Sequence, residues 1–158
     1  MKMTGNKTLI AYATKGGATE KTAQKIAEVL QAKYGLEVDL VNLRKQSAPS
    51  LEPYKNVIVA SGVRSGQIYD ETLKFLDQDF GNRQLAYFTC SAFIYPKTHE
   101  ETVSRYITDV LANYPKFKPV ATEAFGGYLK ILGISVSSKI DMAKVEAWAV
   151  ELGKKLTE

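Results

Sequence analysis

The sequence predicts an α/β fold of three layers, in which a doubly wound, five-stranded parallel sheet lies between two layers of helices. Short apolar runs alternate along the chain with longer segments whose apolar residues recur at helical spacing. The 158 residues, 45% of them hydrophobic, suffice for one domain with a substantial core. The chain has no internal repeat, low-complexity tract or linker. We therefore expect residues 1–158 to form a single domain.

The first half of the chain contains three predicted strands and two predicted helices. Residues 9–13 form a compact apolar run, and residues 23–34 carry an apolar stripe at helical spacing. Gly35 follows this helix where a left-handed residue is common. The segment 38–41 is short and contains a charged residue, as is typical of an edge strand. The segment 57–60 is apolar on both faces and fits the middle of the sheet. The next, shorter helix has three apolar residues on one face: Leu73, Leu76 and Phe80.

The second half repeats the alternation. Strands are predicted at 85–90 and 119–125, and a helix between them spans 103–114 and ends before a proline. The last helix covers 142–156, with Asp141 as its N-cap. Strands that alternate with helices imply right-handed crossovers and a ligand crevice at the carboxyl ends of the strands.

Composition excludes several kinds of site. The chain has one cysteine, Cys90, and one histidine, His99, so it can form neither an intramolecular disulfide nor a Cys₂His₂ zinc site. We predict no metal site and no catalytic side chain, and we place His99 in the first turn of a helix. The lone thiol and the lack of a long apolar run predict a cytoplasmic protein without a transmembrane segment.

The most informative segment is 13–19, between the first strand and the first helix. Two adjacent glycines permit a tight turn with backbone N–H groups close to a ligand, and a helix N-terminus attracts anions. Neither a Walker A loop nor a G-x-G-x-x-G fingerprint is present, so a nest for a terminal monophosphate fits better than either. A helix N-cap with an ordinary tight turn is the alternative interpretation. The predicted phosphate-binding residues are Thr14, Lys15, Gly16, Gly17, Ala18 and Thr19.

Residues 12–23 resemble the FMN-phosphate loop of the flavodoxin family, whose usual form is (Ser/Thr)-x-(Ser/Thr)-Gly-x-Thr. Thr14, Gly17 and Thr19 match this form, whereas Gly16 stands where a second hydroxyl residue is common. The resemblance extends over essentially the whole chain. It implies a flavodoxin-like sheet of strand order 2-1-3-4-5 and FMN as the cofactor, bound between the first and third strands. The segments 60–66 and 123–129 are most similar to the branch that contains the menaquinone-dependent protoporphyrinogen oxidases.

Two further loops follow the third and fourth strands and are predicted to receive the flavin ring. The first comprises Ser61, Gly62, Val63, Arg64, Ser65 and Gly66, and the second contains Thr89, Cys90, Ser91, Ala92, Phe93 and Tyr95. By resemblance, Tyr95 falls where flavodoxins often place a tyrosine against the ring; a partly exposed loop aromatic is the alternative. We expect Cys90 to contribute backbone and not to act as a nucleophile.

Positive charge distinguishes these loops from the usual family pattern. Arg64 stands where many flavodoxins carry an aromatic residue, and no acid lies between Thr89 and Thr98. A cation near the ring favours the anionic, fully reduced flavin, if Arg64 lies there and is not simply solvated. The net charge of +4 is likewise unusual for this commonly acidic family.

The resemblance implies an electron carrier that docks with redox partner proteins, and the basic charge favours acidic, ferredoxin-like partners. The alternative is an FMN-dependent oxidoreductase that acts on a quinone or on protoporphyrinogen. Against it, the segment 128–140 is shorter than the basic and aromatic insertion of those enzymes. We favour a structural interpretation of this segment, as a lid on the core; a small membrane- or substrate-facing apolar patch is the alternative. A signalling receiver domain of the same topology requires acidic residues at the ends of the first and third strands, and this chain has Ala13 and Ser61 there. Nucleic-acid binding is also disfavoured, because the chain has no stripe of Lys and Arg interleaved with aromatic residues. The donor, the acceptor and the oligomeric state stay open.

Overall fold

The computed structural model describes residues 5–92, 98–131, 134–138 and 140–158. Its main sheet has five parallel strands in the order β2-β1-β3-β5-β6, which confirms the predicted order once the short strand β4 is set aside. The strands of this sheet are β1 (Lys7–Ala13), β2 (Val38–Asn42), β3 (Tyr54–Arg64), β5 (Gln84–Ser91) and β6 (Ala121–Gly126). Strand β4 (Gln67–Ile68) pairs antiparallel with the end of β3.

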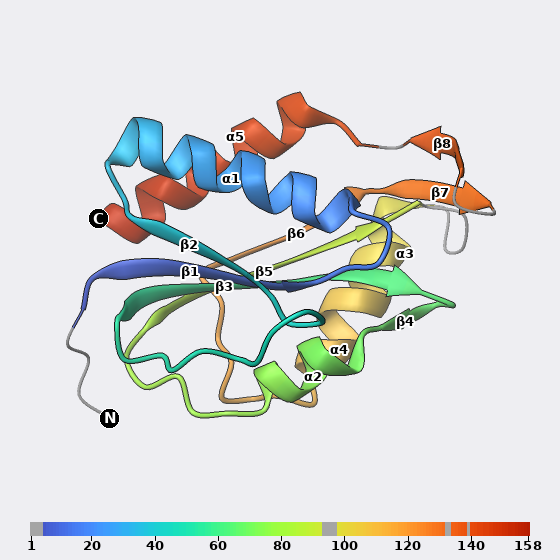
Figure 1. Cartoon of the computed structure of the whole chain (residues 1–158). Coiled ribbons are helices and arrows are strands. Elements are labelled where there is room, and N and C mark those ends of the chain that lie inside the picture. Colours follow the sequence, from blue (N-terminus) through green and yellow to red (C-terminus); the bar gives the residue numbers. More distant parts are fainter. Residues whose placement is uncertain (1–4, 93–97, 132–133, 139) are drawn as a thin grey trace.

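Helices cover both faces of the sheet, as Figure 1 shows. Helices α1 (Ala18–Tyr34) and α5 (Met142–Thr157) lie on one face and contact each other, with the Tyr34 hydroxyl donating to the carbonyl of Val150 at 2.8 Å. The opposite face carries α2 (Asp70–Leu76) and a segmented helix formed by α3 (His99–Val103), a π-helical turn η1 (Ser104–Thr108) and α4 (Asp109–Leu111).

The alternation of side chains along the central strands divides the core into two. Ile10, Ile58 and Phe88 pack with α1 and α5, whereas their neighbours Leu9, Val57 and Tyr87 pack on the other face. Because both faces of β1, β3 and β5 are covered, these strands read as continuous apolar runs. The predicted edge strand is confirmed as β2, and its Leu40 is 37% exposed.

Two predicted helices differ from the structure in their bounds. Helix α2 ends at Leu76, so Phe80 lies beyond it; the ring is nevertheless buried, because it packs edge-on against Phe75 and Phe117 with ring centroids 6.0 and 5.3 Å away. The helix predicted at 103–114 starts earlier, at His99. There the side chain of Thr98 caps it by accepting a hydrogen bond from the N–H of Glu101 at 3.2 Å.

A small antiparallel hairpin follows β6, where we expected only a short lid. It consists of β7 (Tyr128–Ile131) and β8 (Ile134–Ser138) and lies toward the carboxyl end of the sheet (Figure 1). In the part of the chain that the structure describes, no helix combines the length and the apolar character needed to cross a membrane.

Candidate functional site

The three segments predicted to bind one ligand leave the sheet at the same edge. In the register of the parallel strands, Ala13 pairs with Ser61, Gly62 with Cys90, and Ser91 with Gly126. The backbones that follow β1, β3 and β5 are therefore neighbours at the carboxyl end of the sheet. Of the residues predicted for this site, Phe93 and Tyr95 lie outside the described residues.

The loop after β1 forms a tight turn that leads directly into α1. The N–H of Gly17 donates to the Thr14 hydroxyl at 3.1 Å, and Gly17 itself has a φ of 89°, which glycine adopts without strain. Since Gly17 is the N-cap and has no side chain, no side-chain hydrogen bond caps α1 there. The first N–H groups of the helix consequently face this loop, with the positive end of the helix dipole behind them. Lys15 is exposed at the tip.

The buried hydroxyl of Thr19 is the feature of this loop that most directly indicates a bound ligand. Thr19 is 1% exposed, and its Oγ1 pairs with no nitrogen or oxygen of the described residues; the polar contact it makes is a weak one to the Cys90 thiol, whose pKa it lowers. A methyl group at Gly62 would lie only 3.1 Å from that oxygen, so the close approach of β3 to the loop depends on glycine. A buried hydroxyl beside an uncapped helix N-terminus fits a phosphate oxygen, because a buried donor left unpaired costs about 1–3 kcal/mol.

The segment 61–66 is mostly strand and not loop. Strand β3 continues to Arg64, which pairs with Gln67 of β4 across a two-residue turn. Ser65 and Gly66 in this turn have φ values of 51° and 74°, the pattern of a tight hairpin turn with two left-handed residues. The Ser61 hydroxyl is buried and donates to the carbonyl of Gly62 at 2.8 Å. Val63 is half-buried and Arg64 is exposed.

The end of β5 contributes backbone to the site, while two of its side chains point into the core. Cys90 is buried, and its thiol donates to the Thr22 hydroxyl at 3.6 Å. Burial raises the pKa of the Cys90 thiol to about 11, which agrees with the expectation that it is no nucleophile. Thr89 is also fully buried, and its Oγ1 lacks a hydrogen-bond partner among the described residues. Ser91 and Ala92 are half-buried.

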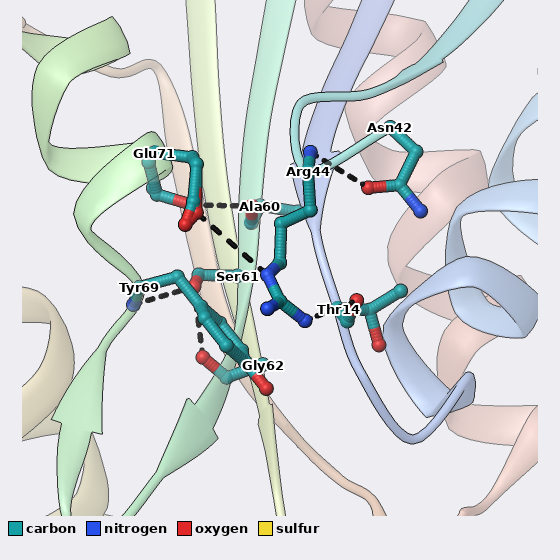
Figure 2. Close-up of polar contacts among 9 residues, drawn as sticks. Thr14, Asn42, Arg44, Ala60, Ser61, Gly62, Tyr69 and Glu71 are labelled. Carbon is teal, nitrogen blue, oxygen red and sulfur yellow. Dashed lines mark hydrogen bonds and ion pairs between the residues drawn. The ribbon is translucent and has the colours of Figure 1, made fainter. Parts of the chain in front are cut away.

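Arg44, Tyr69 and Glu71 are neighbours of this site that the sequence did not indicate (Figure 2). The guanidinium of Arg44 lies 4.7 Å above the centroid of the Tyr69 ring, its Nη1 is 3.5 Å from the carbonyl of Thr14, and its Nε is 3.7 Å from Oε2 of Glu71. Tyr69 in turn donates its N–H to the Ser61 hydroxyl at 3.4 Å. The position of Arg44 just after β2 could have indicated it, because β2 ends beside β1.

His99 starts α3, as predicted, but it is also paired. Its Nε2 lies 2.5 Å from Oε1 of Glu123, which also accepts the N–H of Ala124 at 2.8 Å and has Lys144 Nζ at 4.0 Å. This contact links the start of α3 to β6, at the position of β6 that pairs with Phe88 of β5. No group of three or more His, Cys, Asp and Glu side chains in the described ranges could hold a metal ion.

Comparison with protein families gives a match over most of the chain. The profile of a family described as "Flavodoxin domain" matches residues 9–152. Among curated proteins, protoporphyrinogen IX dehydrogenase [quinone] of Escherichia coli is 29% identical over 70 residues. That alignment covers 44% of this chain and 38% of the enzyme, so the chain matches well under half of the length of that relative.

Solved flavodoxins share the fold. Flavodoxin 2 of Bacillus cereus superposes with a TM-score of 0.69 at 23% identity, over 94% of this chain and 99% of that protein. Flavodoxin 1 of the same organism gives 0.67 at 18% identity, over 96% and 97%. A Fusobacterium nucleatum flavodoxin variant, described as bound to flavin mononucleotide, gives 0.60 at 18% identity, over 96% and 98%.

Proposed function

The chain belongs to the flavodoxin domain family, and we propose from this that it binds FMN and carries electrons between redox partner proteins. One observation in the structure supports the proposal most directly: the buried hydroxyl of Thr19, which pairs with no nitrogen or oxygen of the described residues, lies at the N-terminus of α1, beside the ends of β1 and β3.

We assign the phosphate to the loop after β1. The hydroxyls of Thr14 and Thr19 and the backbone of Lys15, Gly16, Gly17 and Ala18 would hold it, with the dipole of α1 favouring its charge. The ring would lie against the ends of β3 and β5, where Ser61 pairs with Thr89 and Gly62 with Cys90. Val63 and Arg64 on one side, and Ser91 and Ala92 on the other, continue these two segments. Ser65 and Gly66 would shape this wall through the hairpin turn. Phe93 and Tyr95 stay predictions for the outer side of the ring.

When bound, FMN supplies the redox chemistry of such a protein by accepting and releasing electrons. The chain contributes binding, orientation and electrostatics, and we assign no catalytic side chain. Arg64 is a cation at the end of β3, beside the proposed ring wall. A charge about 6 Å from the ring is worth roughly 2–3 kcal/mol at an effective dielectric constant of about 20, and exposure of Arg64 to solvent reduces this value.

The proposal is tested by the visible spectrum and by titration of FMN fluorescence with the purified protein. We expect a flavin spectrum and saturable quenching. A colourless protein that does not quench FMN fluorescence would overturn both this proposal and the alternative below.

We further propose that the redox partners are acidic, as a ferredoxin is, because the chain has a net charge of +4. Electron transfer between such partners should slow as salt screens the charges over roughly 8–10 Å. Salt-independent transfer with an acidic ferredoxin would contradict this. A cytoplasmic location stays a prediction, which cell fractionation can check.

A second candidate function is oxidation of protoporphyrinogen with a quinone as acceptor, as named for the Escherichia coli relative. The matched 70 residues favour it, and the hairpin of β7 and β8 stands at the carboxyl end of the sheet where a substrate would have to approach. Stopped-flow reoxidation of the reduced protein separates the two. Fast reoxidation by menaquinone with slow transfer to a ferredoxin would favour the enzyme, and the reverse would favour the carrier.

A further inference from the structure

A cavity of about 340 Å³ lies on the face of the molecule that carries α2 and α4, and the proposed FMN site shares only Gly66 of the β3–β4 turn with its lining. Its walls come from three elements that are separate in sequence: the β3–β4 hairpin, α2, and the segmented helix of α3, η1 and α4. The volume is at the lower end of the range for small-molecule sites, so it suits a small organic molecule.

Two hydrogen-bond donors converge on one point of this cavity. The position that a methyl group at Gly66 would occupy lies 3.6 Å from Nη2 of Arg105 and 3.9 Å from the hydroxyl of Tyr106. Tyr106 is 2% exposed, and its hydroxyl has no hydrogen-bond partner among the described residues. A buried phenol without a partner is costly, which makes it an independent sign that a polar group of a ligand belongs there.

A π-helical turn carries both of these side chains. Arg105 and Tyr106 lie in the π-helical turn η1, a wider turn than that of an α-helix and one that often occurs at functional sites. The buried hydroxyl of Tyr87 donates to the carbonyl of Tyr106 at 3.3 Å and so stabilises this turn. The apolar stripe over 103–114 does not include Tyr106, yet both Tyr106 and Ile107 are buried in the π turn.

The other lining residues indicate the chemical class of the ligand. Ile68, Leu73 and Val110 provide apolar contacts for its body, and Asp70 is the acid at the cavity. A guanidinium with a neutral hydroxyl beside it binds a carboxylate better than an uncharged group. A second negative charge would meet Asp70 and is disfavoured. We propose that this cavity binds a small monocarboxylate with an apolar, ring-sized body.

The test uses benzoate as the probe, added to the FMN-loaded, ¹⁵N-labelled protein and followed by two-dimensional NMR. We expect saturable shifts of amide signals from Gly66, Leu73 and Tyr106. Benzamide, which has the same shape without the charge, should bind at least about tenfold more weakly, because a charge-assisted hydrogen bond contributes about 1.5–3 kcal/mol. Terephthalate, with its second carboxylate, should also bind more weakly than benzoate.

Two variants test the hydrogen-bond donors, and a third serves as the control. Arg105→Met should raise the Kd of benzoate about tenfold or more, and Tyr106→Phe should raise it about threefold or more while keeping the ring in place. Lys118→Met removes an exposed cation at the other end of the sheet and should leave the Kd unchanged. The proposal is overturned if benzoate causes no saturable shifts at this cavity, if benzamide binds equally well, or if Arg105→Met binds as the wild type does. Flavin fluorescence in the same samples reports FMN binding separately, so the two proposals can fail independently.

Discussion

The guanidinium of Arg44 lies over the face of the Tyr69 ring, 4.7 Å from its centroid, and thereby links three segments of the proposed FMN site. Arg44 follows β2, Tyr69 follows the β3–β4 hairpin, and the carbonyl of Thr14, 3.5 Å from Arg44 Nη1, belongs to the loop after β1. The contacts to Thr14 and Glu71 are longer than the 2.7–2.9 Å of a strong charged hydrogen bond, at about 3.5 Å or more. The charge of Arg44 is therefore available to an anion at the neighbouring loop.

Replacement of this arginine should affect the cofactor more than the fold. We expect Arg44→Met to raise the Kd of FMN about tenfold, which corresponds to about 1.4 kcal/mol, and to change that of riboflavin less. Arg44 is exposed, so the free energy of unfolding of the apoprotein should change by only about 0.5 kcal/mol or less. Lys45→Met, next to it and also exposed, is the matched control for the loss of one charge. Equal weakening of FMN and riboflavin would show that Arg44 does not act on the phosphate.

Removal of the Thr19 hydroxyl should change stability and binding in opposite directions. Thr19→Val keeps the shape of the side chain, so the apoprotein should become more stable by about 1 kcal/mol, because the buried hydroxyl pairs with no nitrogen or oxygen of the described residues. FMN should bind about tenfold or more weakly. Thr22→Val is the control, since Thr22 is equally buried in α1 and its hydroxyl also contacts the Cys90 thiol, so this variant removes such a contact without removing a hydroxyl from the loop after β1. Chemical denaturation and fluorescence titration measure the two effects, and a Thr19→Val protein of unchanged FMN affinity would exclude Thr19 from the site.

The contact between α1 and α5 leaves no room for a side chain at Gly153. A methyl group there would overlap the ring of Tyr34, so Gly153→Ala should destabilise the protein by about 1–3 kcal/mol despite the better helix propensity of alanine. Thermal or chemical denaturation gives the value. In a Tyr34→Ala background the same substitution should be neutral or stabilising, and a cost that persists there would show that the overlap is not the cause.

The free energy of unfolding at acid pH should depend on Asp39. The Tyr54 hydroxyl donates to this carboxylate at 2.8 Å and Lys7 pairs with it at 3.0 Å, and together these contacts lower the pKa of Asp39. Burial, followed by the hydrogen bond to Asp39, raises the pKa of Tyr54 to about 12. A lowered folded-state pKa contributes stability that is fully present above the unfolded value of about 3.9 and is lost as pH falls through the folded value.

Chemical denaturation from about pH 2 to about pH 6, a range that brackets the unfolded pKa, measures this contribution. Asp39→Asn should make the stability less dependent on pH in this range, and Tyr54→Phe should reduce the dependence in part. An unchanged slope in Asp39→Asn would contradict the assignment.

The single thiol should be inert in the folded protein. Cys90 is 3% exposed and burial raises its pKa to about 11, so a thiol reagent such as Ellman's reagent should react only at the rate at which the protein opens. Denatured protein should react at once and serves as the control. Rapid reaction of the folded protein at neutral pH would contradict the buried position.

The sequence alone predicts the architecture, because the strands and helices are indicated by local, periodic patterns of apolar residues. Apolar runs such as 9–13 and 57–60 are continuous since helices cover both sides of the strands, and Gly35 ends α1 in the left-handed conformation expected of it, with a φ of 64°. The loop after β1 was likewise recognisable from its glycines and hydroxyls. The register of the strands then brings it next to the ends of β3 and β5.

What the sequence did not indicate depends on contacts between distant residues. The π turn at 104–108 is stabilised by a hydrogen bond from Tyr87, which belongs to another element, and the position of Arg44 depends on a stacking partner 25 residues later, Tyr69. The turn at Ser65 and Gly66 is local, but serine does not commonly adopt a positive φ, so the sequence alone predicts a loop over 61–66 and not a hairpin.

The strand order has a consequence for how the protein folds. Neighbouring strands of the five-stranded parallel sheet cannot pair through a short turn, and every pair requires a connection that passes across the sheet. Such pairings close long loops before they gain contacts, so folding should be slow compared with that of a helical bundle of the same size. The ends of β1, β3 and β5 become neighbours only when these pairings are complete. A cofactor that binds there selects the fully folded chain and stabilises it by mass action, so its binding also measures how much of the protein has folded.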